Sequence, residues 1–307
     1  MRLDDYDNDI NVGEARGGGG LGGGGGGGGF LLGLLPLIGS RFGCGGIVVV
    51  LLLFAVFGGL GNLGSMIGGG TGTGTGTGSA PQVGTPSRET VQQVCDVSTA
   101  RRDTCRAFSN AQNTWEKIFA RENQRFSPPK LQFFNGSGMS GCGAAMSAMG
   151  PFYCPTDNGI YLDTSFFDEL ANKYKAGGDF AQYYVIAHEF GHHIQNLLGT
   201  SAEVQQAQRR ASEAEGNALS VRLELQADCY AGVWAAMNRD RLDPGDVEEG
   251  MRAAQAIGDD TLQREAQGRV VPDSFTHGTS AQRQAWLRRG IESNGNPGVC
   301  DTFSGTI

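Results

Sequence analysis

Two histidines and a glutamate in one apolar stretch have the residue types and spacing of a metal-dependent hydrolase. His188 and His192 are four positions apart. Such positions share one face of an α-helix, so both imidazoles can bind one ion. Glu189 follows the first histidine and would lie beside the open coordination position, where a carboxylate can take a proton from water. The stretch therefore predicts a catalytic zinc site with Glu189 as general base.

A catalytic zinc site usually has three protein ligands and a water molecule, so a third ligand has to be found. Glu224 and Asp228 have the same four-residue spacing. We predict that Glu224 binds the metal and that Asp228 accepts a hydrogen bond from a ligand imidazole, which would fix its tautomer. Glu213 and Glu215 are the alternative ligands, but they lie in a polar segment, whereas apolar residues follow Glu224.

The chain has four histidines, and the two that are not predicted ligands have different expected roles. His193 would point about 100° away from its neighbour around the helix, so it is expected to pack or form hydrogen bonds. His277 lies in a later segment with Arg283. These two residues are predicted to stabilise the oxyanion that forms when water attacks a carbonyl. Alternatively, Thr276 and Ser280 merely cap the next helix.

Motifs along most of the chain resemble those of known peptidases. The paired motifs are similar to those of gluzincin metallopeptidases, and E-x-x-A-D at 224–228 is the form seen in membrane-associated peptidases related to CAAX prenyl protease. T-H-G-x-x-x-x-R is similar to their T-H-P-x-x-x-x-R element, with Gly278 in place of proline. The glycine-rich start, the apolar span and the motifs FYCPTDNGIYLD, AHEFGHHIQNLLG, ELQADCYAGVWA and SFTHGTSAQRQAWL resemble the bacterial neutral zinc metallopeptidase family. This resemblance covers about residues 90–300 and implies a zincin-like fold that binds zinc.

The first third of the chain has the composition of a tail, an anchor and a linker. Residues 42–60 carry no charge and approach the ~20 residues that a membrane-spanning helix needs. Glycine-rich stretches flank them and cannot form a core. We predict a disordered acidic cytoplasmic tail at 1–29, a membrane anchor at 30–63, a flexible linker at 64–90 and a metallopeptidase domain at 91–307. A cleaved signal peptide and a buried core helix are the alternatives for the span.

Charged residues and cysteines predict the orientation of the anchor. Arg2, Arg16 and Arg41 precede the span and no basic residue follows it until Arg88, so the positive-inside rule places the N-terminus in the cytoplasm and the domain outside. Six cysteines of the domain form an even set, which favours disulfides. Pairing of neighbours predicts the bonds Cys95–Cys105, Cys142–Cys154 and Cys229–Cys300, although Cys229 could instead be a free buried thiol.

Apolar periodicity predicts an α+β fold that is mostly helical, with a single N-terminal transmembrane helix. In the zincin folds that the motifs resemble, an edge strand pairs with extended substrate along the cleft, and Ile160–Asp163 is predicted to be that strand. Tyr161 could line the cleft or pack in the core. Short strands are expected at 131–134 and 161–163. Helices are expected at 98–126, 164–175 and 180–198, from 201, through Glu224 to 238, and at 246–266 and 279–290.

These features together predict a zinc metallopeptidase tethered to a bacterial cell membrane. It would bind one zinc ion per chain, contact the lipid bilayer through its N-terminal helix and cleave a peptide or protein substrate. The net charge of −8 and the absence of a basic stripe give no reason to expect nucleic-acid binding. The alternatives are a non-catalytic zinc scaffold with His277 as fourth ligand and an amidase acting on cell-wall peptide. His277 could also plug the site and keep a peptidase latent.

Overall fold

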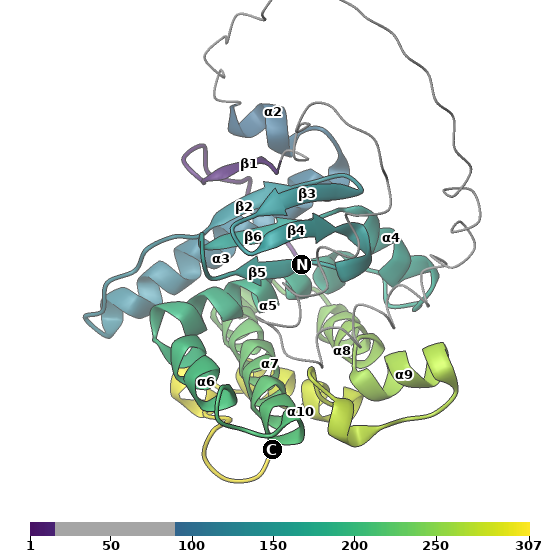
Figure 1. Ribbon diagram of the computed structural model, residues 1–307. Coiled ribbons are helices and arrows are strands. Elements are labelled where there is room, and N and C mark those ends of the chain that lie inside the picture. Colours follow the sequence, from purple (N-terminus) through teal and green to yellow (C-terminus); the bar gives the residue numbers. More distant parts are fainter. Residues whose placement is uncertain (16–89) are drawn as a thin grey trace, which may run out of the picture.

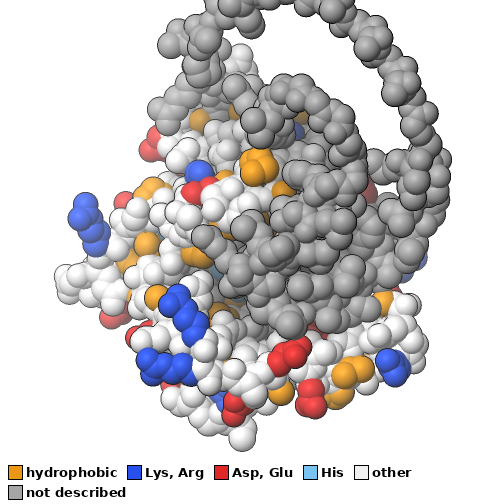
Figure 2. All heavy atoms as spheres, viewed as in Figure 1, with side chains coloured by type: hydrophobic (Ala, Val, Ile, Leu, Met, Phe, Trp, Pro, Cys, Tyr) orange, Lys and Arg blue, Asp and Glu red, His pale blue; other side chains and the backbone are white. Residues whose placement is uncertain are grey.

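The computed structural model describes residues 1–15 and 90–307. Helices outnumber strands in these parts, which confirms the predicted mostly helical α+β class (Figure 1). The predicted span at 42–60 lies outside the described residues. In the two described stretches, no helix combines the length and the hydropathy needed to cross a membrane. On the described part of the face in Figure 2, acidic and basic side chains are interspersed.

The helices follow the predicted order with two differences: the short helix at Val91–Cys95 was not predicted, and one predicted helix is divided. Their bounds are α2 (Val91–Cys95), α3 (Thr99–Arg121), α4 (Ser165–Asn172), α5 (Asp179–Leu197), α6 (Thr200–Gln208), α7 (Glu213–Met237), α8 (Asp246–Ala256), α9 (Asp259–Gln267) and α10 (Ser280–Ile291). The single helix predicted for 246–266 is wrong, because the backbone of Gly258 is extended and separates α8 from α9.

Four strands form the main sheet, in the order β1-β2-β6-β5. They are β1 (Val12–Glu14), β2 (Lys130–Phe133), β6 (Gly159–Leu162) and β5 (Phe152–Cys154); a separate hairpin consists of β3 (Ser137–Ser140) and β4 (Gly143–Met146). Strands β1, β2 and β6 are parallel, and β5 pairs antiparallel with β6.

The predicted edge strand is an interior strand. Gly159–Leu162 pairs with β2 on one side and with β5 on the other, and all four of its residues are buried. The prediction that Ile160–Asp163 lies along the cleft edge is therefore wrong, and Tyr161 is buried within the fold. Pairing on both sides cannot be seen in the sequence, because a short apolar strand fits both an edge and an interior position. The terminal strand on this side of the sheet is β5.

The first fifteen residues pack onto the domain, so the predicted disorder of 1–29 is wrong for this part. Strand β1 extends the sheet beside β2. The α-ammonium group of Met1 lies 3.0 Å from a carboxylate oxygen of Asp179 and 2.9 Å from one of Asp246. Further along, Asp5 forms an ion pair with Arg106 at 2.6 Å. The acidic start of the chain therefore has partners on α3, α5 and α8.

Three disulfide bonds join the predicted cysteine pairs. They are Cys95–Cys105, Cys142–Cys154 and Cys229–Cys300. Cys229 is therefore paired, and the alternative of a free thiol beside the metal helix is wrong. Its bond ties the C-terminal segment to the middle of α7. Loss of a native disulfide from a small domain typically costs about 2–5 kcal/mol of stability.

Candidate metal centre

Helices α5 and α7 bring the three predicted ligands together. Nε2 of His188 lies 3.2 Å from Oε2 of Glu224, and Nε2 of His192 lies 3.5 Å from Oε1 of the same carboxylate. Zinc bonds of about 2.0–2.1 Å in a tetrahedron require donors to be about 3.3 Å apart. The donor types and these two distances fit a zinc ion, which would have one of its four coordination positions left for another ligand.

A glycine inside the histidine motif permits this approach of the helices. A Cβ atom on Gly191 would lie 3.0 Å from both the Cα and the carbonyl oxygen of Ala227 on α7. Because these are backbone atoms, a side chain at this position would push the two helices apart. Gly191 thus lets His188 and His192 face Glu224 across a close helix crossing.

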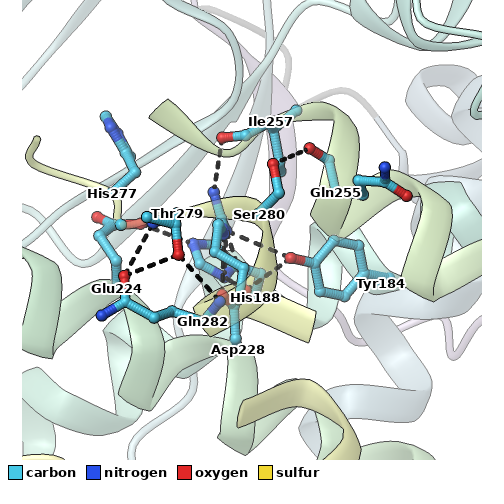
Figure 3. Close-up of polar contacts among 12 residues, drawn as sticks. Tyr184, His188, Glu224, Asp228, Gln255, Ile257, His277, Thr279, Ser280 and Gln282 are labelled. Carbon is cyan, nitrogen blue, oxygen red and sulfur yellow. Dashed lines mark hydrogen bonds and ion pairs between the residues drawn. The ribbon is translucent and has the colours of Figure 1, made fainter. Parts of the chain in front are cut away.

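Hydrogen bonds orient both imidazoles with Nε2 toward the centre. Nδ1 of His188 lies 2.8 Å from Oδ1 of Asp228, which also accepts a hydrogen bond from the Tyr184 hydroxyl at 2.6 Å. Nδ1 of His192 lies 2.9 Å from Oε1 of Gln195. When Nδ1 carries the proton, Nε2 has a free lone pair for a metal. Figure 3 shows Tyr184 on one side of His188 and Glu224 on the other.

Arg283 contacts the candidate metal centre through Asp228, the carboxylate that orients His188. Its side chain is 2% exposed, and its Nε and Nη2 atoms donate to the two carboxylate oxygens of Asp228, each at 2.9 Å. Nη2 also lies 3.3 Å from the Tyr184 hydroxyl. The predicted contact of Arg283 with a substrate oxyanion stays a prediction; in this structure the guanidinium is buried and bound to the carboxylate that orients His188.

Glu189 is a buried carboxyl group beside the ligands. The residue is 7% exposed, and within the described chain its carboxylate accepts no hydrogen bond. Burial raises the pKa of Glu189, while the nearby imidazoles of His192 and His188 act in the opposite direction. A buried carboxylate is costly without a partner. Its surroundings therefore favour a proton or a cation close to it.

The charges of the ligands depend on one another. Burial would lower the pKa of His188, but the Asp228 carboxylate outweighs this effect and raises it to about 9. The pKa of His192 is also raised, against the effect of burial, by the Glu224 carboxylate. Although burial acts to raise it, the pKa of Glu224 is held well below its usual value by His192 and His277. Without a metal, the carboxylates thus favour protonated imidazoles.

The ligand atoms of the three predicted ligands lie within 4.8 Å of one another in the described chain. His277 lies near Glu224 but does not belong to this group. Its side chain is 36% exposed, and its Nδ1 lies 3.3 Å from Oδ1 of Asp259. Gly278 has φ +89°, which proline cannot adopt. The loop therefore differs in backbone conformation from the T-H-P element that it resembles.

The other histidine and glutamates considered from the sequence contact residues outside the candidate metal centre. His193 is fully buried; its Nε2 lies 2.7 Å from the carbonyl oxygen of Ser127 and its Nδ1 3.1 Å from the Tyr153 hydroxyl. Burial lowers the pKa of His193 to about 4. Glu213 and Glu215 lie in the exposed first turn of α7, where Glu215 forms a capping box with Ser212.

Three further residues contact the predicted site residues, and none of them was predicted from the sequence. Tyr184 and Gln195 occupy positions one turn away from a ligand on the same helix, at i−4 from His188 and i+3 from His192, so helical spacing could have revealed them. Asp259 lies 18 positions before His277, and its contact depends on the fold of the intervening loop.

A family model described as "Putative neutral zinc metallopeptidase" matches residues 1–303. The chain belongs to this family. The match includes the packed N-terminal segment as well as the candidate metal centre.

Curated relatives of this zinc metallopeptidase family member come from Escherichia coli and from mycobacteria. "Uncharacterized protein YpfJ" of Escherichia coli (strain K12) is 52% identical over 210 residues, which are 68% of this chain and 73% of the relative. "Uncharacterized protein Rv2575" of Mycobacterium tuberculosis (strain H37Rv) is 44% identical over 192 residues, which are 58% and 64% of the two chains. No solved structure matches the chain.

Proposed function

We propose that this protein is a zinc-dependent metallopeptidase in which His188, His192 and Glu224 hold the metal. One observation carries the proposal: three donor side chains, with ligand atoms within 4.8 Å of one another, lie beside a buried glutamate that has no hydrogen-bond partner in the described chain. Membership of the zinc metallopeptidase family supports the same metal and reaction class. A zinc ion bound here would polarise a peptide carbonyl and acidify water at neutral pH.

The side chains around the ion divide the work of hydrolysis. Glu189 accepts the proton of the attacking water and then delivers it to the leaving amine. His277 stabilises the charge that develops on the carbonyl oxygen. Asp228, held by Arg283, keeps His188 in the tautomer that binds metal. In this proposal Arg283 is a positioning residue and does not touch the substrate.

The terminal strand β5 is a candidate binding site for an extended peptide substrate. β5 ends the strand order, and Tyr153 on this strand packs against His193 of the metal helix with ring centroids 5.5 Å apart. An extended peptide can add to a terminal strand through its main-chain groups. We propose that the scissile peptide runs along β5, in place of the segment Ile160–Asp163 expected from the sequence.

A closed, non-catalytic zinc site is the less favoured function. Such a site needs a fourth protein ligand, and within the described residues the donor group has three members without His277. A structural zinc site also does not explain why Glu189 places a buried carboxyl group beside the ligands. The three disulfides support the predicted extracytoplasmic location; attachment to a membrane stays a prediction.

The test compares Glu189→Gln with the wild type on a peptide library. We expect the variant to keep about one zinc per chain and to lose at least ~100-fold in kcat/KM, the usual contribution of a general base. Glu116→Gln, at an exposed position on α3, is the matched control and should behave as the wild type. Full activity of Glu189→Gln would refute the proposed mechanism.

A further inference from the structure

A short loop, Thr276–Gly278, carries His277 near Glu224 of the candidate metal centre. It lies between α9 and α10, and the His277 side chain is partly exposed. Burial acts to lower the pKa of His277, but the Glu224 and Asp259 carboxylates outweigh it and raise this pKa. Figure 3 shows both on the same side of His188. The position of this loop therefore decides where the imidazole stands relative to a substrate.

One buried carboxylate holds the whole loop. Oδ2 of Asp259 accepts hydrogen bonds from the main-chain N–H groups of Thr276, His277 and Gly278, at 2.7, 2.6 and 3.0 Å. In return, the N–H group of Asp259 donates to the carbonyl oxygen of Gly278 at 2.9 Å. Asp259 is 6% exposed. Hydrogen bonds from three consecutive N–H groups to one charged oxygen are stronger than neutral ones and fix the backbone.

The same carboxylate also contacts the imidazole. Its Oδ1 atom lies 3.3 Å from Nδ1 of His277, and the hydroxyl oxygen of Thr276 lies 3.1 Å from that nitrogen. With Nδ1 engaged in this way, Nε2 is the nitrogen left for a substrate. This is how second-layer carboxylates orient a histidine in metal sites and catalytic triads.

The adjacent aspartate has a separate partner. Asp260 accepts hydrogen bonds from the N–H and hydroxyl groups of Ser280, at 2.7 and 2.8 Å. Ser280 is the first residue of α10, the helix that carries Arg283. The start of α9 thus fixes the His277 loop through one side chain and the following helix through the next.

We propose that Asp259 is a positioning residue of the reaction, which directs Nε2 of His277 toward the carbonyl oxygen of the substrate. This inference rests on the proposed peptidase function and deepens it. Asp259 itself touches neither the metal ligands nor the substrate. Its effect on turnover passes through His277.

A double-mutant cycle tests this dependence on the zinc-loaded full chain. Asp259→Asn should lower kcat by about 10- to 100-fold with KM within about twofold, because the misplaced imidazole acts in the transition state. In a His277→Ala background the same substitution should change kcat by less than about twofold. Asp273→Asn, at an exposed position of the preceding turn, is the control and should leave kcat unchanged. Equal losses in both backgrounds would overturn the proposal.

A second measurement needs neither activity nor a variant. With four histidines in the chain, nitrogen-15 NMR can assign each ring. Once His277 is neutral, the proposal expects its proton on Nδ1, instead of the Nε2–H form that a free imidazole favours. An Nε2–H form or a mixture of both would overturn it. Glu189→Gln with wild-type activity would refute the proposed function but leave this NMR result standing.

Discussion

The chemistry of individual residues gives this site its metal preference and its dependence on pH. Three donors, two of them imidazoles, suit zinc. Behind them, Asp228 and Gln195 each engage one Nδ1 atom. The ligands were predictable because i, i+4 spacing on a helix is a local property of the sequence. Asp259 was not, because its carboxylate reaches a loop 18 positions away.

At the residue scale, zinc binding is expected to release protons. His188 has a pKa raised to about 9 in the metal-free protein, and the pKa of His192 is raised as well. Zinc needs both imidazoles unprotonated, so at pH 7 it must displace at least one proton. The apparent affinity should therefore fall roughly tenfold per pH unit and per displaced proton as pH decreases from 8 to 6.

Calorimetry in buffers of different ionisation enthalpy measures this release directly. Wild type and the surface control Glu116→Gln should release the same number of protons. A zinc affinity that is constant between pH 6 and 8 would contradict the protonated state that the Asp228 and Glu224 carboxylates favour.

At the scale of elements, the crossing of α5 and α7 determines whether the ligands meet. The order of the helices could be predicted from apolar periodicity, and the disulfides from neighbouring cysteines. The interior position of β6 and the break between α8 and α9 could not. Strand neighbours depend on tertiary pairing, and the break depends on how the backbone around Gly258 folds.

Gly191→Ala is expected to destabilise the fold although it changes no ligand. The added methyl group would meet the backbone of Ala227 at 3.0 Å, and such overpacking typically costs about 1–3 kcal/mol. Gly216, on α7 with no atom within 4 Å of an added Cβ, provides the control. Gly216→Ala should instead stabilise the helix by up to about 1 kcal/mol. Thermal unfolding of the metal-free variants checks both, and an equal gain in stability for both would contradict a tight crossing.

At the scale of the whole molecule, the N-terminal segment packs as part of the domain that holds the candidate metal centre. Residues 1–15 could not be placed from the sequence, because the partners of their side chains lie 84 or more positions away, as with Asp5 and Arg106. The packing also bears on the predicted orientation. A single membrane crossing between residues 15 and 90 would separate β1 from β2, to which it is hydrogen-bonded.

We therefore predict that residues 1–15 and the domain share one compartment. Asp9→Cys and Glu116→Cys each place a thiol at an exposed position. Both are made together with Cys44→Ser, which removes the one cysteine that does not belong to the three disulfides. A membrane-impermeant maleimide added to intact cells should label both variants or neither. Labelling of Glu116→Cys without Asp9→Cys would show the orientation expected from the positive-inside rule and contradict the packed segment.

The coordination of zinc in the purified protein tests the central claim most directly. X-ray absorption at the zinc edge should give two imidazole nitrogens and carboxylate or water oxygens at about 2.0–2.2 Å, without sulfur. Glu224→Gln should bind zinc much more weakly, while Glu213→Gln should bind it as the wild type does. Sulfur in the coordination sphere, or full zinc binding by Glu224→Gln, would contradict the account.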